Sequence, residues 1–354
     1  MPDSSPETEI RLLALHSLRG ANFWSRRPVT RMDLVVGSYD DISSAEVPSV
    51  ASSLERAMPG LVEHRCSVGE RGGFLRRLRR GTYAPHIIEH VALELQVMAG
   101  CDVGYGKARG GDAPGEYVLV FEHCHSKAGL RAAALALEVV QRAFSGTLES
   151  VEHAVQELRS VLQTPDAPPL RPRVLCGITG GGPRHETREE MVRRGFNDAE
   201  LLVDVAPASL LHAGLPYSHS EMAIILDSDL SDVPRRYREH ERARQLVGVV
   251  VDGVTRDGLV IVPAKERELR AYARDHDCRV AIFATDEDLT SRDQRDTQAR
   301  AFVREHRIVL ESPDRSCDGG VLHDDAPAAA QVAAALAMFT LEERQPETCP
   351  AVTR

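Results

Sequence analysis

The segment at residues 82–99 holds the side chains of this sequence best suited to chemistry. His86, Glu89 and His90 form an H-x-x-E-H motif, and apolar residues recur around it at helical spacing after Pro85. On a helix the two imidazoles would lie one turn apart on one face, so both could bind one metal ion. Glu89 would lie on nearly the same face, where its carboxylate could act as a general base toward water. The motif is typical of the inverted zincin order, in which zinc assists hydrolysis.

The same residues also have a purely structural interpretation. Two histidines at positions i and i+4 among apolar neighbours can be ordinary helix residues, and short motifs match by chance. Four ionisable side chains nevertheless fall within nine positions of an otherwise apolar helix, namely His86, Glu89, His90 and Glu94. Because burying that many polar groups is costly unless they are used, we favour the metal site.

Several short elements must position this helix. The sequence predicts strands over residues 10–18, 32–36 and 117–122, and helices over residues 50–58, 74–80, 128–144 and 148–162. The glycine-rich segment 101–115 is expected to be a flexible loop near the site. Strands followed by helices indicate an α+β domain, which we place at residues 1–163.

A second domain is expected after a proline-rich linker at residues 164–172. From there to residue 341, short apolar strands alternate with polar helices, which predicts an α/β fold with a parallel sheet covered by helices. The expected strands are residues 174–178, 201–203, 222–226, 247–251, 259–262 and 280–283. Residues 342–354 are expected to form a polar tail.

The composition limits the compartment and the kind of partner. The net charge of −10 argues against nucleic-acid binding and suits a cationic or arginine-rich ligand. The seven cysteines are odd in number, scattered and without a C-x-x-C pair, which is typical of a reducing compartment. The N-terminus lacks the basic and apolar regions of a signal peptide, and no apolar run is long enough to span a bilayer. We therefore expect a cytoplasmic protein without a membrane partner.

Stretches outside the motif occur in the order of a known family. They are R-G-A-N-F-W-S at 19–25, E-H-R-C-S at 63–67, R-G-G-F-L at 71–75, H-I-I-E-H-V-A-L-E-L-Q at 86–96, G-Y-G at 104–106 and Y-V-L-V-F-E at 117–122. In these stretches the first domain resembles the N-terminal domain of cyanophycin synthetase, a ligase that builds poly-aspartate carrying arginine on each side chain. In part of that family, the domain resembles a zinc metallopeptidase that cuts the polymer internally.

The resemblance implies roles for several residues. It makes His86 and His90 zinc ligands and Glu89 the base, and a catalytic zinc needs a third protein ligand. For that ligand we favour Glu122, at the end of a strand, and Cys66, His64 and His123 remain alternatives. Glu94 would lie about 12 Å along the helix axis from the first histidine, so we expect it to orient a histidine instead. Arg71, Gly72 and Gly73 are the candidates for substrate binding.

The second domain is similar to the Mur-ligase-like part of the same synthetases, with its nucleotide-binding residues changed. The strand and glycines of a phosphate loop are kept up to Gly182, but Pro183, Arg184 and His185 stand where the loop's glycine, lysine and threonine belong. Further family positions hold Asp204, Asp232, Arg244, Pro263 and Lys265. The resemblance therefore predicts a degenerate P-loop that binds neither ATP nor another nucleotide.

These features favour one function and leave others open. A zinc-dependent hydrolase that cuts cyanophycin or a similar arginine-bearing peptide agrees best with the motif. The alternative is a non-catalytic scaffold or binding partner of a separate ATP-dependent ligase. Ligase activity ranks last, because only the linker stands where the synthetases carry an ATP-grasp domain. By analogy with the family we also expect a homo-oligomer.

Overall fold

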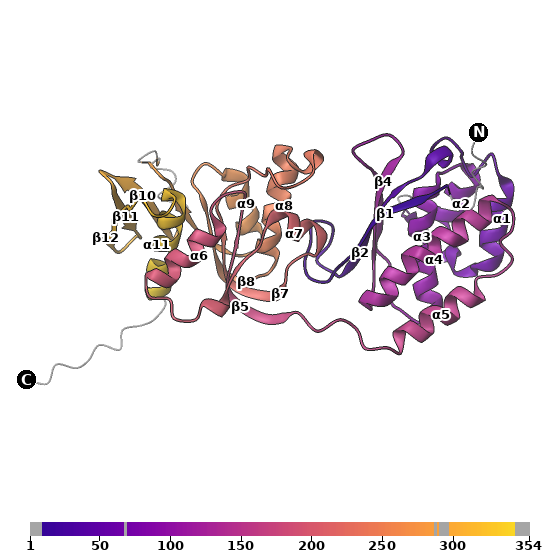
Figure 1. Ribbon diagram of the computed structural model, residues 1–354, viewed down its shortest axis with the longest axis horizontal. Coiled ribbons are helices and arrows are strands. Elements are labelled where there is room, and N and C mark those ends of the chain that lie inside the picture. Colours follow the sequence, from indigo (N-terminus) through magenta and orange to yellow (C-terminus); the bar gives the residue numbers. More distant parts are fainter. Residues whose placement is uncertain (1–8, 67–68, 287–288, 290–296, 344–354) are drawn as a thin grey trace, which may run out of the picture. The chain divides into compact units, whose positions relative to one another are not determined.

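The structure, a computed structural model, describes residues 9–66, 69–286, 289 and 297–343 (Figure 1). The chain divides into two compact units, Met1–Pro169 and Leu170–Arg354, so the division falls within the proline-rich segment. Two residues of the predicted linker, Arg171 and Pro172, already belong to the first strand of the second unit. Within the described ranges, none of the helices is both long and apolar enough to cross a bilayer.

The first unit is built on a four-stranded antiparallel sheet in the order β1-β2-β4-β3. Its strands are β1 (Arg11–Leu18), β2 (Val29–Val35), β3 (Gly106–Gly110) and β4 (Glu116–Glu122). Strand β3 corrects the expectation of a flexible loop over 101–115. Its backbone pairs with β4 from Gly106 opposite Phe121 to Gly110 opposite Tyr117, and this pairing overrides the low strand propensity of glycine.

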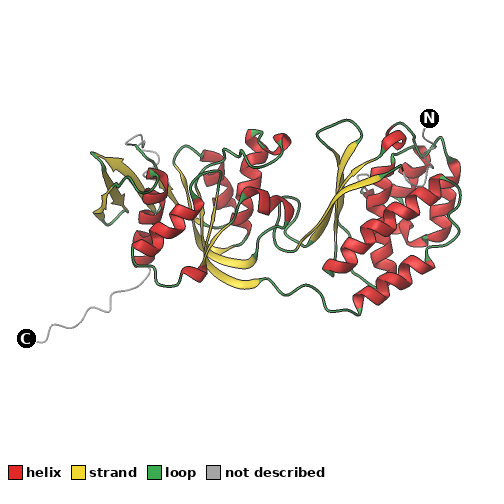
Figure 2. Cartoon of the chain, in the orientation of Figure 1, coloured by secondary structure: helices red, strands yellow, loops and turns green. Residues whose placement is uncertain are grey.

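Helices pack against this sheet and against one another (Figure 2). They are α1 (Pro48–Ala57), α2 (Gly73–Arg80), α3 (Ala84–Ala99), α4 (Ser126–Phe144) and α5 (Glu152–Leu162), with a 3-10 turn at Pro59–Glu63. Helix α3 carries the H-x-x-E-H motif. Pro85 lies in its first turn, as the sequence predicts, and Gly100 ends it in a left-handed conformation.

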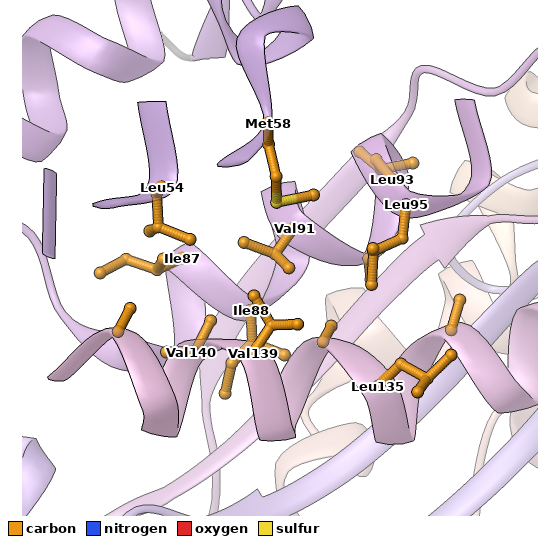
Figure 3. Close-up of a cluster of buried hydrophobic side chains, with 14 of the residues drawn as sticks. Leu54, Met58, Ile87, Ile88, Val91, Leu93, Leu95, Leu135, Val139 and Val140 are labelled. Carbon is orange, nitrogen blue, oxygen red and sulfur yellow. The ribbon is translucent and has the colours of Figure 1, made fainter. Parts of the chain in front are cut away.

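The apolar residues of α3 fix the direction in which its polar residues point (Figure 3). Its buried side chains lie between α1 and α4, where they form one core with Leu54 and Met58 on one side and Val139 and Val140 on the other. Each aliphatic side chain buried in this way contributes about 1.5–3 kcal/mol. Because the apolar faces of α3 are held on both sides, its rotation about its own axis is fixed.

A disulfide joins Cys101, just after α3, to Cys124, just after β4. The scattered cysteines, which we interpreted as typical of a reducing compartment, did not indicate this pair. Among the described residues, Cys66, Cys176, Cys278 and Cys317 take part in no disulfide. Cys349 lies outside the described residues.

The second unit has an eight-stranded sheet in the order β12-β11-β10-β9-β8-β7-β5-β6. Its strands are β5 (Arg171–Thr179), β6 (Leu202–Asp204), β7 (Tyr217–Ile225), β8 (Val254–Pro263), β9 (Arg279–Phe283), β10 (Ala299–Arg304), β11 (Arg307–Glu311) and β12 (Ser316–Val321). Neighbouring strands among β5 to β10 pair in parallel. Strands β11 and β12 extend the sheet beyond β10 in antiparallel pairing. The two predicted fold classes, an α+β domain followed by an α/β domain, are thus confirmed.

Two sequence expectations fail in this unit. Residues 247–251, expected as a strand, are the end of helix α8 (His240–Asp252). A short apolar run does not distinguish a strand from a buried helix, and a helix is needed here because β7 and β8 are parallel. Strands β10 to β12 were not predicted. The remaining helices are α6 (Arg184–Arg193), α7 (Pro207–His212), α9 (Arg267–Asp275) and α11 (Ala328–Glu342); the expected tail beyond residue 343 lies outside the described residues.

Candidate metal centre

Three side chains from two segments converge at the first turns of α3. Ligand atoms of Cys66, His86 and His90 all lie within 4.8 Å of one another. Zinc bonds of about 2.3 Å to sulfur and about 2.0–2.1 Å to nitrogen place two tetrahedral ligands about 3.5 Å apart. The Cys66 Sγ and the His86 Nε2 are 3.2 Å apart, close to that separation. A thiolate with two imidazoles is a donor set that suits zinc and leaves a fourth position for water or substrate.

Thr82 orients the first histidine. Its Oγ1 lies 2.9 Å from the Nδ1 of His86, while the Nε2 of that ring faces Cys66. We therefore assign the ring proton to Nδ1, which donates to the threonine hydroxyl and leaves a lone pair on Nε2. Thr82 is buried just before α3 begins, so the imidazole is held from both edges.

A chain of hydrogen bonds orients the second histidine. The Nε2 of His64 donates to the Glu94 Oε2 at 3.0 Å, and the Nδ1 atoms of His64 and His90 are 2.8 Å apart. Since the Glu94 carboxylate accepts the first proton, the Nδ1 of His64 must accept the second from His90. The Nε2 of His90 then carries a lone pair. Glu94 thus acts on His90 through His64, whereas at many zinc sites a carboxylate bonds directly to the histidine that binds the metal.

Burial keeps both histidines of the motif in the neutral form that binds metals. Desolvation lowers the pKa of His86 to about 4, with a smaller contribution from the charge of Arg77. It lowers the pKa of His90 to about 2, with further contributions from the neighbouring His86 and His64. Neutral imidazoles do not repel a cation, so the site can accept a metal ion at neutral pH.

Glu89 lies beside the donors without being one of them. It is 5% exposed, and burial raises the pKa of its carboxyl to about 8, opposed by the charge of Arg77. Gly106 of β3 makes room for it, because a Cβ atom at that position would lie 2.5 Å from the Glu89 Oε1. Burial thus favours the protonated carboxyl, and a cation held by the neighbouring donors would favour the carboxylate, which is the form that can accept a proton.

A cavity of about 840 Å³ gives access to this cluster. The donors Cys66, His86 and His90 and the carboxyl of Glu89 line it together with the first residues of β3. Three cations line it as well, namely Arg65, Arg77 and Lys107. The cavity is large enough for a peptide segment to reach the donors.

The structure does not bring Glu122 to the two histidines, and Cys66 is the side chain that it places beside them. Its Oε2 accepts hydrogen bonds from the backbone amides of Gly104 and Tyr105 at 2.9 and 3.0 Å, and its Oε1 accepts one from Arg27 at 3.3 Å. Glu122 thus fastens the turn that leads into β3.

The other candidates occupy different places. His123 hydrogen-bonds to Thr30 at 3.0 Å, within the first unit's sheet region. Arg71 pairs with Glu63, and Gly72 and Gly73 form the start of α2. The described lining of the cavity contains neither His123 nor the three residues 71–73.

The sequence did not reveal two supporting features. Thr82 stands four residues before His86, which is a spacing on one helical face and could have indicated the contact. The second feature is the space that Gly60 leaves for Glu94, which the sequence does not indicate. A Cβ there would lie 2.0 Å from the Glu94 Oε1, and no local pattern indicates that this glycine and Glu94 meet.

The phosphate loop of the second unit is filled by the protein itself. The amide of Gly181 donates to the Asp227 Oδ1 at 2.8 Å, and a Cβ at Gly182 would lie 2.5 Å from the Asp227 Oδ2. Arg184 turns back to the carbonyl of Gly180. A carboxylate therefore occupies the position at the glycines where a phosphate group would need backbone amides.

Comparison with known proteins finds relatives of the first unit. Residues 31–145 match the family model described as the cyanophycin synthase-like N-terminal domain. The cyanophycin synthetase of Crocosphaera subtropica is 39% identical over 157 residues, 43% of this chain and 18% of that protein. That of Trichormus variabilis is 42% identical over 134 residues, 37% and 15% of the two chains. The predicted relation to cyanophycin synthetases is confirmed, and the chain spans less than a fifth of the length of these relatives.

Solved structures of Mur ligases are also similar to this chain. The MurF ligase of Thermotoga maritima in complex with ADP has a TM-score of 0.35 and 10% identity, over 50% of this chain and 47% of that one. The MurF of Acinetobacter baumannii has a TM-score of 0.32 and 12% identity, over 48% and 42%.

Proposed function

We propose that the first unit is a zinc-dependent hydrolase that cuts amide bonds in a peptide polymer. The observation that supports this most is the convergence of Cys66, His86 and His90 beside Glu89 in one cavity. The donor set and the neutral imidazoles both fit zinc. Bound there, zinc would supply a Lewis acid that polarises the scissile carbonyl and makes water more acidic.

The protein's own residues divide the remaining work. Glu89 takes the proton of the attacking water and passes it to the leaving amine nitrogen, so that the amine departs uncharged. Cys66 and the two histidines hold the ion, and Thr82 and His64 hold the histidine rings in the required tautomers. The imidazole rings of His86 and His90 and the carboxyl of Glu89 therefore need not be rearranged when the substrate binds.

The relatives suggest the substrate. They are named cyanophycin synthetases, so we propose cyanophycin or a similar arginine-bearing peptide as the polymer that is cut. ATP is not expected to take part, because Asp227 fills the phosphate loop. Self-assembly and pairing with a separate ligase are further proposals from the family relation.

The first experiment removes the base and keeps the ligands. Glu89→Gln is expected to lower kcat at least 1000-fold while the protein still binds one zinc per chain, because an amide cannot take up the proton. Cleavage is measured from product masses after incubation with cyanophycin, and zinc by elemental analysis. Glu138→Gln, an exposed position on α4, is the control and should match the wild type. Full cleavage by Glu89→Gln would reject the mechanism, and neither zinc nor cleavage in the wild type would favour a non-catalytic scaffold.

The contact between Cys66 and His86 also permits a second candidate function. A thiol 3.2 Å from an imidazole that is held by a hydroxyl resembles the nucleophile and base of a cysteine hydrolase. Removal of metal by 1,10-phenanthroline separates the two. A zinc hydrolase loses its activity and regains it when zinc is added back, whereas a thiol nucleophile is unaffected by the chelator.

A further inference from the structure

We propose that the cavity recognises a carboxylate of the substrate through the cations Arg65, Arg77 and Lys107. This inference rests on the proposed hydrolase function and names the chemical group by which that site selects its substrate. The chain as a whole is acidic, with a net charge of −10, and would attract the guanidinium groups of an arginine-bearing polymer. The wall of the cavity differs in charge from the chain as a whole, because these three cations line it.

The three cations reach the cavity from three different segments. Arg65 precedes the donor Cys66, Arg77 belongs to α2, and Lys107 follows Gly106 in β3. All three line the same cavity as Glu89 and the metal donors. A substrate group that approaches the donors therefore enters a space with positive charge on several sides.

The acidic residues of the same wall are already engaged. Glu63 forms a two-point ion pair with Arg71, at 2.8 and 2.5 Å. Glu94 accepts the proton of His64 at 3.0 Å. Glu89 serves the reaction itself. Among the described residues that line the cavity, no further Asp or Glu is present to receive a guanidinium group.

A carboxylate is the substrate group that fits this wall. Arginine and lysine bind carboxylates through charge-assisted hydrogen bonds, and the loss of one such contact costs about tenfold to a hundredfold in affinity. An arginine that is joined to an aspartate side chain through its α-amino group keeps a free carboxylate, whereas agmatine joined in the same way has none. The polymer's carboxylates would thus enter the cavity, and its guanidinium groups would remain outside it.

Three matched probes separate the two charges. Each is a short poly-aspartate whose side-chain carboxyls are joined to arginine, to agmatine, which lacks the carboxylate, or to citrulline, which lacks the positive charge. With the zinc-loaded full chain, we expect the agmatine probe to have a kcat/KM at least tenfold below that of the arginine probe, mainly through KM. The citrulline probe should stay within about threefold. Equal cleavage of the agmatine and arginine probes would overturn the inference.

Variants locate the effect at the cavity. Lys107→Gln and Arg65→Gln should each reduce the discrimination between the arginine and agmatine probes at least threefold. Arg79→Gln should leave it unchanged, because Arg79 lies on α2 but pairs with Glu55 and is absent from the described lining of the cavity. Discrimination that survives both cavity variants would reject these residues as the carboxylate site.

A binding measurement separates this inference from the hydrolase proposal. The zinc-loaded Glu89→Gln protein is titrated with the arginine and agmatine probes by calorimetry. Tighter binding of the arginine probe, by tenfold or more, would support the carboxylate site even if the wild type cleaved neither probe. Equal binding would overturn the inference even if the wild type cleaved both.

Discussion

His64 shows how a residue outside the motif can decide what the motif does. Its ring stands between Glu94 and His90, accepts the proton of one partner and gives its own to the other. The tautomer of His90 follows from that chain of hydrogen bonds, and the tautomer determines which nitrogen can bind a metal. Glu94 contacts His64 and reaches His90 only through that ring, and its role in orienting a metal-binding histidine stays a prediction.

Removing this support should weaken the metal site without removing a ligand. His64→Gln is expected to raise the dissociation constant for zinc about 10- to 100-fold, because His90 loses the partner that fixes its tautomer. Competition with a chelator of known affinity measures the change. His153→Gln, an exposed position on α5, should bind zinc like the wild type. An unchanged affinity in the folded His64→Gln protein would show that the chain of hydrogen bonds does not support the metal.

At the scale of elements, strand β3 forms the wall of the site opposite α3. Its first residue, Gly106, is glycine for a steric reason, because the Glu89 side chain occupies the space of a Cβ atom. The next residue, Lys107, lines the cavity. Pairing with β4 and the bonds from Glu122 to the preceding turn fix β3 in this position. The edge strand thus limits where the Glu89 side chain can lie and places Lys107 at the cavity.

A methyl group on β3 should displace the base and spare the metal. Gly106→Ala places its Cβ 2.5 Å from the Glu89 Oε1, so we expect kcat to fall at least tenfold with zinc content unchanged. Gly110→Ala on the same strand meets no atom within 4 Å and should behave like the wild type. Equal rates for the two variants would contradict the proposed position of the base.

A buried histidine that directly follows β4 should make the stability of the first unit depend on pH. His123 hydrogen-bonds to Thr30, and burial lowers its pKa from 6.5 to about 4. The folded pKa is depressed, so the unfolded chain binds the extra proton between these values. His123 therefore contributes fully to the free energy of unfolding above pH 6.5. This contribution, about 3 kcal/mol in total, is lost as the pH falls from 6.5 through 4.

Urea unfolding at pH 7 and pH 5, followed by fluorescence of the single tryptophan, Trp24, measures this loss in the first unit. In His123→Gln the difference between the two pH values should be smaller than in the wild type. His185→Gln, an exposed position in the second unit, should leave it unchanged. The same loss in His123→Gln as in the wild type would assign it to other groups.

At the scale of the whole molecule, the two units have separate apolar cores. One core is formed by residues between Ile10 and Leu162, and the other by residues between Leu175 and Leu341. All residues of the candidate metal centre and its cavity lie in the first unit. Each unit should therefore fold without the other.

The fragment of residues 1–169 tests this separation. We expect it to bind one zinc and to cleave the arginine probe with a kcat/KM within about threefold of the full chain, because no described residue of the site is removed. Circular dichroism provides the check that it folds. A folded fragment without activity would show that the second unit contributes to the site.

The sequence by itself determined the face on which the motif lies. Helical periodicity places His86 and His90 one turn apart, and the apolar residues between them had to point into a core. The same local rules predicted both fold classes and most of the strands. They failed where the environment decides, as at 247–251, where parallel neighbours required a helix, and at β3, where pairing outweighed composition.

Only the tertiary structure decided which distant residues complete the site. Cys66 and Glu122 are both far from the motif in sequence, and nothing local distinguishes them as third ligand. The fold brings Cys66 to His86 and uses Glu122 to hold a turn. The physical reason is that periodicity is set by neighbours along the chain, whereas the meeting of two segments depends on the packing of every element between them.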